Sequence, residues 1–137
     1  MAYHHCFESD HTLIVVDASG PADYASTVAE IAALAEELRA APGTTILIDA
    51  RAGTYVPTTC EVKMIVGALV KDRALFRETR LMIVVEDLVR FGLGRMFAAL
   101  ADIWGIRVEV FRSMCAARVR LTGEIGAEPV LELRDRV

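Results

Sequence analysis

Short runs of consecutive apolar residues alternate along this chain with segments in which apolar side chains recur every three or four positions. The first pattern is typical of buried strands, and the second of helices that bury one face. Gly20-Pro21 and Pro42-Gly43 mark two of the boundaries between these segments, because neither strand nor helix continues easily through them. The pattern predicts strands at residues 2–9, 11–19, 44–50, 80–87 and 106–111. It predicts helices at residues 22–41, 59–76, 88–104 and 113–121.

The order of these elements indicates the fold. A turn at Ser9-Asp10 joins the first two strands, which are expected to form an antiparallel hairpin. The later strands alternate with helices, which implies parallel pairing through right-handed crossovers. Their apolar composition is typical of strands that helices cover. We therefore expect an α/β protein with a mainly parallel five-stranded sheet, an N-terminal antiparallel hairpin, the order ββαβαβαβα and helices on the sheet faces.

The last residues differ in character from the rest. Gly123, Gly126 and Pro129 interrupt any periodic pattern there, although the short apolar stretch PVLEL lies among them. The sequence thus predicts a single domain over residues 1–122 and a C-terminal tail over residues 123–137.

Composition limits the classes of function. The 137 residues are 54% hydrophobic and 25% charged, an apolar share high enough that a partner or a ligand is expected to cover some of it. The formal net charge of −4 disfavours nucleic-acid binding, which needs a basic face. No apolar run approaches the roughly 20 residues of a membrane span. Three cysteines without a C-x-x-C pair, and no signal-peptide pattern, predict free thiols and a cytoplasmic location.

Two local patterns resemble those of a known family. ILIDARAGTYVPTTCEV (46–62) is similar to the stretch of STAS domains (sulfate transporter and anti-sigma-factor antagonist) in which an apolar strand ends in Asp and a loop leads to Asp-Ser-Ser-Gly at a helix start. VEVFRSMCAARVRL (108–121) is similar to the closing strand and helix of the small bacterial SpoIIAA-like branch. The resemblance covers the predicted domain. Pro57, Cys60 and Arg120 depart from it, because the family has Asp, Gly and Trp there.

The resemblance implies a non-enzymatic domain that binds protein partners, and for the SpoIIAA-like branch binding of apolar small molecules in an internal cavity has been proposed. It also places Thr58 where anti-sigma antagonists have their phosphorylated serine. A phosphate there would meet the unpaired N–H groups of a helix N-terminus. The residues themselves favour a cap, because Thr58 and Glu61 form a T-x-x-E capping box. We therefore expect Thr58 or Thr59 to cap the helix, with phosphorylation of either residue as the alternative.

The helix predicted at residues 88–104 contains a G-x-G that lacks the third glycine of a dinucleotide site. Glycines inside a helix weaken it, so they are expected to serve packing. Ordinary core packing, a dimer contact and a ligand-lined cavity are all open explanations. The candidate surface for an apolar ligand or a dimer consists of Phe91, Met96, Phe97, Leu100 and Trp104.

Candidates for catalysis or metal binding are weak. Adjacent His4 and His5 point to opposite faces of a strand, and no third ligand accompanies them and His11, so no metal site is expected. Nothing places a histidine beside a Ser or Cys nucleophile. Carboxylates stand at strand ends, where α/β sheets often bind ligands, but they suit helix caps and loop amides equally well. These carboxylates are Asp49, Glu86 and Asp87.

The leading hypothesis is therefore a cytoplasmic, non-catalytic STAS-like binding or regulatory domain that acts through a protein partner or as a homodimer. A carrier or sensor of a small apolar ligand, held in a cavity between sheet and helices, is the alternative from a different class. A phosphorylation-switched regulator resembling anti-sigma antagonists is a second alternative, and an enzyme using the strand-end carboxylates ranks last. No cofactor, metal ion, nucleic acid or membrane span is expected.

Overall fold

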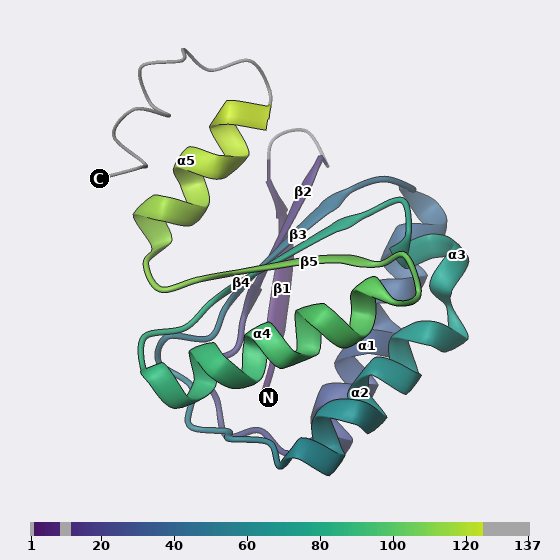
Figure 1. The fold of residues 1–137 in the computed structure, drawn as a ribbon. Coiled ribbons are helices and arrows are strands. Elements are labelled where there is room, and N and C mark those ends of the chain that lie inside the picture. The colour runs from purple at the N-terminus through teal and green to yellow at the C-terminus, as the bar shows by residue number, and fades with distance from the viewer. Residues whose placement is uncertain (1, 9–11, 125–137) are drawn as a thin grey trace.

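The computed structural model describes residues 2–8 and 12–124 (Figure 1). Its strands are β1 (His4–Glu8), β2 (Leu13–Asp17), β3 (Thr45–Asp49), β4 (Arg80–Val84) and β5 (Arg107–Phe111). Its helices are α1 (Tyr24–Ala40), α2 (Thr59–Lys71), α3 (Arg73–Phe76), α4 (Leu88–Asp102) and α5 (Met114–Glu124). The strands form one sheet in the order of the chain, with β1 antiparallel to β2 and the other pairs parallel. The predicted fold class and element order are confirmed.

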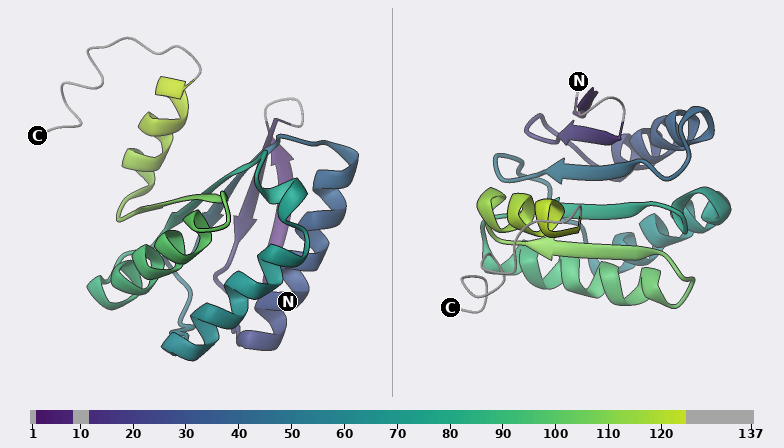
Figure 2. Two further views of the ribbon diagram at one scale, coloured as in Figure 1. Left: turned by 45° about the vertical axis from the view of Figure 1, so that its right-hand side comes forward. Right: turned by 90° about the horizontal axis from the view of Figure 1, so that it is seen from above.

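The sheet has two unequally covered faces. Because its parallel strands follow one another in sequence order, right-handed crossovers place every connecting helix on the same side. Helices α1, α2 and α4 lie on this side, here called the helical face, and α5 lies on the other (Figure 2). The larger core fills the helical face with residues such as Ile14, Ile46 and Leu81. A smaller core, which includes Leu47 and Met82, lies beneath α5.

Several predicted helix ends are confirmed in detail. Gly105 follows α4 with φ 77°, a conformation that glycine adopts without strain. The backbone N–H of Ala116 donates to Ser113 Oγ at 3.0 Å, so Ser113 caps α5 as expected. Asp87 caps α4 by accepting the Arg90 N–H at 3.0 Å. Local side-chain chemistry therefore sets these boundaries.

Two boundaries differ from the prediction. The single helix expected at residues 59–76 is interrupted at Asp72, whose φ of −117° and ψ of 37° leave the helical region. The Asp72 carboxylate accepts from Arg39 Nη2 of α1 at 2.9 Å, a tertiary contact that no local pattern encodes. Helix α5 continues to Glu124, beyond the predicted end of the domain. Most of the predicted tail, the turn at Ser9-Asp10 and His11 lie outside the described residues.

Two further expectations bear on the environment of the protein. None of the helices in the described part of the chain combines the length and the apolar composition that a membrane span requires. Cys6, Cys60 and Cys115 are free and exposed, as the sequence predicts.

Candidate functional site

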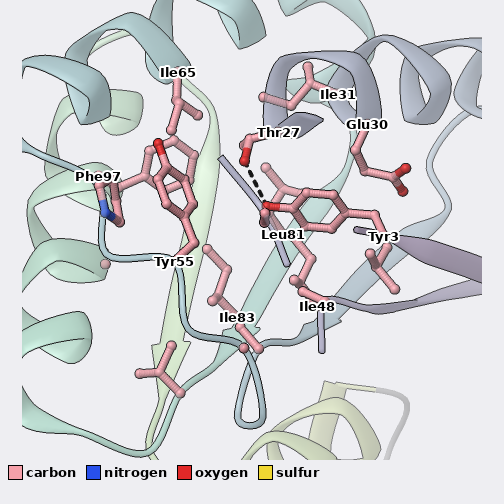
Figure 3. Close-up of a pocket in the computed structure, with 18 of the residues that line it drawn as sticks. Tyr3, Thr27, Glu30, Ile31, Ile48, Tyr55, Ile65, Leu81, Ile83 and Phe97 are labelled. Carbon is pink, nitrogen blue, oxygen red and sulfur yellow. Dashed lines mark hydrogen bonds between the residues drawn. The ribbon is translucent and has the colours of Figure 1, made fainter. Parts of the chain in front are cut away.

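A cavity of about 190 Å³ lies between the helical face of the sheet and helices α1, α2 and α4 (Figure 3). Side chains of β2, β3 and β4 form its floor, and loops at the C-terminal ends of these strands complete it. It is partly open to solvent. This is the edge at which α/β sheets usually bind ligands. The side chains labelled in Figure 3 that give the cavity its apolar character are Ile31, Ile48, Ile65, Leu81, Ile83 and Phe97.

The exposure of two isoleucines locates the gap. Ile46 and Ile48 lie on the same face of the central strand β3, yet Ile46 is fully buried and Ile48 is only half-buried. On the adjacent strand β4, Leu81 is buried while Ile83 is half-buried. Side chains on the helix-covered face of an inner strand are normally sealed from water. The helices therefore leave the sheet uncovered above Ile48 and Ile83, although they pack closely above Ile46.

Small residues shape the cavity. A Cβ on Gly53 would lie 2.5 Å from the carbonyl oxygen of Ala18, so only glycine allows the loop after β3 to approach the end of β2. A Cβ on Gly94 would lie 2.9 Å from Val110 Cγ1, so this glycine brings α4 close to β5. Gly94 also lines the cavity, whereas a Cβ on Gly92 would meet no atom within 4 Å. Core packing thus explains Gly94, one of the two glycines in α4. Nothing in the structure explains the other, Gly92.

Two tyrosines from different elements line the cavity and use their hydroxyls within the protein. The hydroxyl of Thr27 donates to the carbonyl oxygen of Asp23 at 2.7 Å, so the Tyr3 hydroxyl donates to Thr27 Oγ1, also at 2.7 Å. The Tyr55 hydroxyl donates to Glu61 Oε1 at 3.1 Å. Burial raises the pKa of Tyr3 and of Tyr55, and the hydrogen bond to Glu61 raises that of Tyr55 further. Both phenols are neutral and hold their rings in fixed positions.

The predicted capping box is part of this arrangement. Thr58 Oγ1 accepts the Glu61 N–H at 3.1 Å, and Glu61 Oε1 accepts the Thr58 N–H at 3.0 Å. The same Glu61 oxygen accepts the Tyr55 hydroxyl, so the cap fixes both the start of α2 and one wall of the cavity. Thr58 and Thr59 are exposed, and phosphorylation at either residue stays a prediction.

Arg90 joins the loop after β3 to the start of α4. Its Nη1 donates to the carbonyl oxygen of Ala50 at 2.7 Å, and its Nε donates to Asp87 Oδ1 at 2.6 Å. The Arg90 side chain and backbone hold the pKa of Asp87 below its usual value. Although Arg90 lines the cavity, its guanidinium is already committed to these partners. Arg90 therefore holds the loop after β3 against the start of α4, and the interior of the cavity stays apolar.

The candidate surface predicted on α4 is only partly found at the cavity. Phe97 lines it, but Met96 and Leu100 do not. Phe91 lies against Arg95 on a different flank of the helix, and Trp104 lies exposed beyond the end of α4. Sequence periodicity could not identify the lining face, because apolar residues cover more than half of this helix. A dimer contact through the remaining residues stays a prediction.

The strand-end carboxylates do not reach the cavity. Asp49 accepts from Arg51 Nε and Nη2, both at 2.9 Å, and these hydrogen bonds hold its pKa below its usual value. Asp49 also accepts the Arg51 N–H at 3.2 Å, which confirms its predicted role with loop amides. With Asp17 and Glu86 it lines a separate shallow hollow outside the apolar cavity.

A contact that the sequence did not reveal connects β1 to α1. His5 Nδ1 lies 2.9 Å from Glu30 Oε2, and His5 Nε2 lies 3.2 Å from Glu37 Oε2. Glu30 and Glu37 are seven residues apart and share one face of α1, but no local pattern places β1 beside them. Among the residues that the structure describes, no group of three His, Cys, Asp or Glu could hold a metal ion.

Chemically, this site is suited to enclosing an apolar body. The hydroxyls, the guanidinium and the carboxylates around it are occupied by partners within the protein. Comparison of the chain with protein-family models, curated proteins and solved structures finds no match. The resemblance to STAS domains therefore stays a prediction, and the case for function depends on the geometry of the cavity.

Proposed function

We propose that this protein is a non-catalytic, STAS-like binding domain that holds a small apolar molecule between its sheet and helices α1, α2 and α4. The observation that carries this proposal is the apolar cavity of about 190 Å³, partly open at the C-terminal edge of the sheet. Protein interiors are normally packed as densely as organic crystals, with few voids larger than a water molecule. An apolar space of this size therefore calls for an occupant.

An empty cavity of this size would also lower the stability of the protein. Residual cavity volume in a protein core costs about 24 cal/mol per Å³, so an empty, closed cavity of about 190 Å³ would cost on the order of 5 kcal/mol. Partial opening to solvent lowers this figure. Small domains have total stabilities of only about 5–15 kcal/mol, so the cost is a large fraction of the whole. A ligand that fills the space recovers the lost contacts and stabilises the folded state by mass action.

The volume limits the size of the ligand. A closed, engineered cavity of about 150 Å³ lined by Leu, Ile and Phe binds benzene. The present cavity is slightly larger and lined by the same residue types, so it suits a molecule with a single ring or a short branched chain. A long acyl chain would extend out through the opening.

Free cysteines support the proposed cytoplasmic location, because exposed thiols persist in reducing compartments.

Native mass spectrometry of protein purified from its own host tests the proposal. We expect a non-covalent adduct of low mass on the wild-type protein, released by gentle collisional activation. The matched variant is Ile83→Phe, which places a larger ring in the cavity and is expected to lose the adduct. The control is Ile103→Phe, because Ile103 is exposed at the far end of α4 and is absent from the cavity lining. A wild-type protein without adduct, or an adduct retained in full by Ile83→Phe, would contradict the proposal.

A further inference from the structure

A second hollow, separate from the apolar cavity, follows the outer edge of β5. It has a volume of about 610 Å³ and is bounded by one flank of α4, by β5 and by residues of β4 and α5. Within the described part of the chain, β5 pairs only with β4 and is the last strand of the sheet. Its outer edge therefore presents backbone N–H and C=O groups without a strand partner. An extended peptide can add to such an edge as a further strand.

The side of the hollow next to α4 is mostly apolar. Phe91, Ala98 and Ala99 lie at helical spacing on the flank of α4 that borders β5. The two alanines have short side chains, which leaves room for a neighbouring backbone. Val108 and Val110 of β5 point toward this same side of the sheet, because residues two apart on a strand share a face.

The opposite side is charged. Arg107 and Glu109 alternate with the valines on β5, and Arg80 and Arg120 lie beside them. Glu109 bridges the two neighbours, with Oε1 to Arg80 Nη2 and with Oε2 at 2.9 Å from Arg120 Nε. These arginines hold the pKa of Glu109 below its usual value, although burial alone would raise it. Glu109 is thus committed to the protein.

Two arginines in the hollow have no carboxylate partner among the described residues. Arg95 lies over the ring of Phe91 at 5.9 Å from its centroid, and Arg107 is exposed. Altogether the hollow contains four arginines against two carboxylates, Glu109 and Asp102. This local excess of positive charge contrasts with the net charge of −4 for the chain. It calls for negative charge from another molecule.

We propose that the β5 edge binds an extended segment of a partner protein in which acidic and apolar residues alternate. Successive side chains of an added strand point to opposite faces. Its apolar residues would contact Phe91, Ala98 and Ala99, and its acidic residues would pair with Arg107. Arg95 lies over Phe91 on the α4 side of the hollow. A second copy of this chain fits poorly, because its β5 edge carries the same excess of arginine over carboxylate.

Peptide selection tests this inference independently of the apolar cavity. Nine-residue random peptides displayed on phage are selected on the wild-type protein, and bound peptides are then measured by fluorescence anisotropy. We expect enrichment of sequences in which Asp or Glu alternates with apolar residues. The double variant Arg95→Glu/Arg107→Glu should lose at least about tenfold in affinity, and Lys63→Glu, an exposed charge reversal on α2, should change it less than twofold. Replacing the acidic residues of the peptide with Lys should restore binding to the double variant.

Hydrogen exchange locates the contact. Bound peptide should slow amide exchange at alternate residues within Arg107–Phe111, and a peptide with a central proline should not, because proline cannot donate to the sheet. The inference is overturned if selection yields no binder or only neutral or basic binders. It is also overturned if protection appears elsewhere, or if the β5 amides are already protected in the free full-length chain. A dimer that Arg107→Glu disrupts, or an oligonucleotide that competes at the same arginines, would likewise assign the edge to another occupant.

Discussion

Replacing Ile83 with Phe should stabilise the protein, which is the opposite of what the same change does in a packed core. Ile83 lies on β4, next to the central strand β3, and its side chain points into the cavity (Figure 3). Its half-buried state shows that neighbouring atoms do not yet surround it. A phenyl ring at this position can extend into the empty space without displacing a helix.

The magnitude follows from the atoms added. Phenylalanine has three more side-chain carbon atoms than isoleucine, and each buried carbon group contributes about 0.8 kcal/mol, so the gain reaches about 2 kcal/mol at most. Fixing the ring in a single orientation reduces this to about 1 kcal/mol. The matched control is Ile46→Phe, on the same face of β3, where the side chain is fully buried and does not line the cavity. Overpacking at that position should cost about 1–3 kcal/mol.

Urea unfolding of the two variants and the wild type, followed by circular dichroism, measures both changes. With an m-value of about 1–3 kcal/mol/M, we expect the midpoint to rise by about 0.5 M for Ile83→Phe and to fall by 0.5 M or more for Ile46→Phe. Equal destabilisation by the two variants would refute the reasoning, because it would mean that the helices pack as tightly above Ile83 as above Ile46.

Three further predictions concern the surroundings of the cavity. Thr58→Ala removes the cap of α2 and should lower the free energy of unfolding by about 0.5–2 kcal/mol in urea unfolding, whereas Thr59→Ala should change it by less than about 0.5 kcal/mol. Gly53→Ala should cost about 1–3 kcal/mol, since its Cβ would lie 2.5 Å from a backbone oxygen, and a neutral result would show that the loop after β3 shifts freely. The pKa values of Tyr3 and Tyr55 are raised in the folded protein. Their contribution to the free energy of unfolding is therefore complete below pH 10 and is lost as the pH rises above it. Thermal unfolding between pH 9 and 11 should show this loss, and Tyr55→Phe should reduce its slope; an unchanged slope would refute the assignment.

Much of the fold followed from sequence pattern alone. The strands 44–50 and 80–87 were recognisable as apolar runs, and glycine or capping residues marked the ends of α4 and α5. These features are local, so a single sequence contains them. The break at Asp72 was not recognisable, because it depends on a contact with Arg39 of another helix.

The cavity was only partly predictable. The high apolar content and the adaptable side chains of α4 left an internal cavity open as one alternative, and Phe97 does line it. The contributions of Tyr3 and Tyr55 could not be foreseen, because they depend on how the N-terminus and the loop after β3 approach the helices in space. Distances between elements are tertiary information. They decide whether an apolar surface is packed or left open.

The most direct test of the central claim is a methyl NMR titration of the protein with benzene as the probe. We expect saturable, single-site shifts of the Ile48 and Ile83 methyl signals, with Ile103 and Ile46 unaffected, and no shift of the Ile48 signal in the Ile83→Phe variant. An absence of saturable shifts at Ile48 and Ile83, or equal shifts at exposed Ile103, would contradict it.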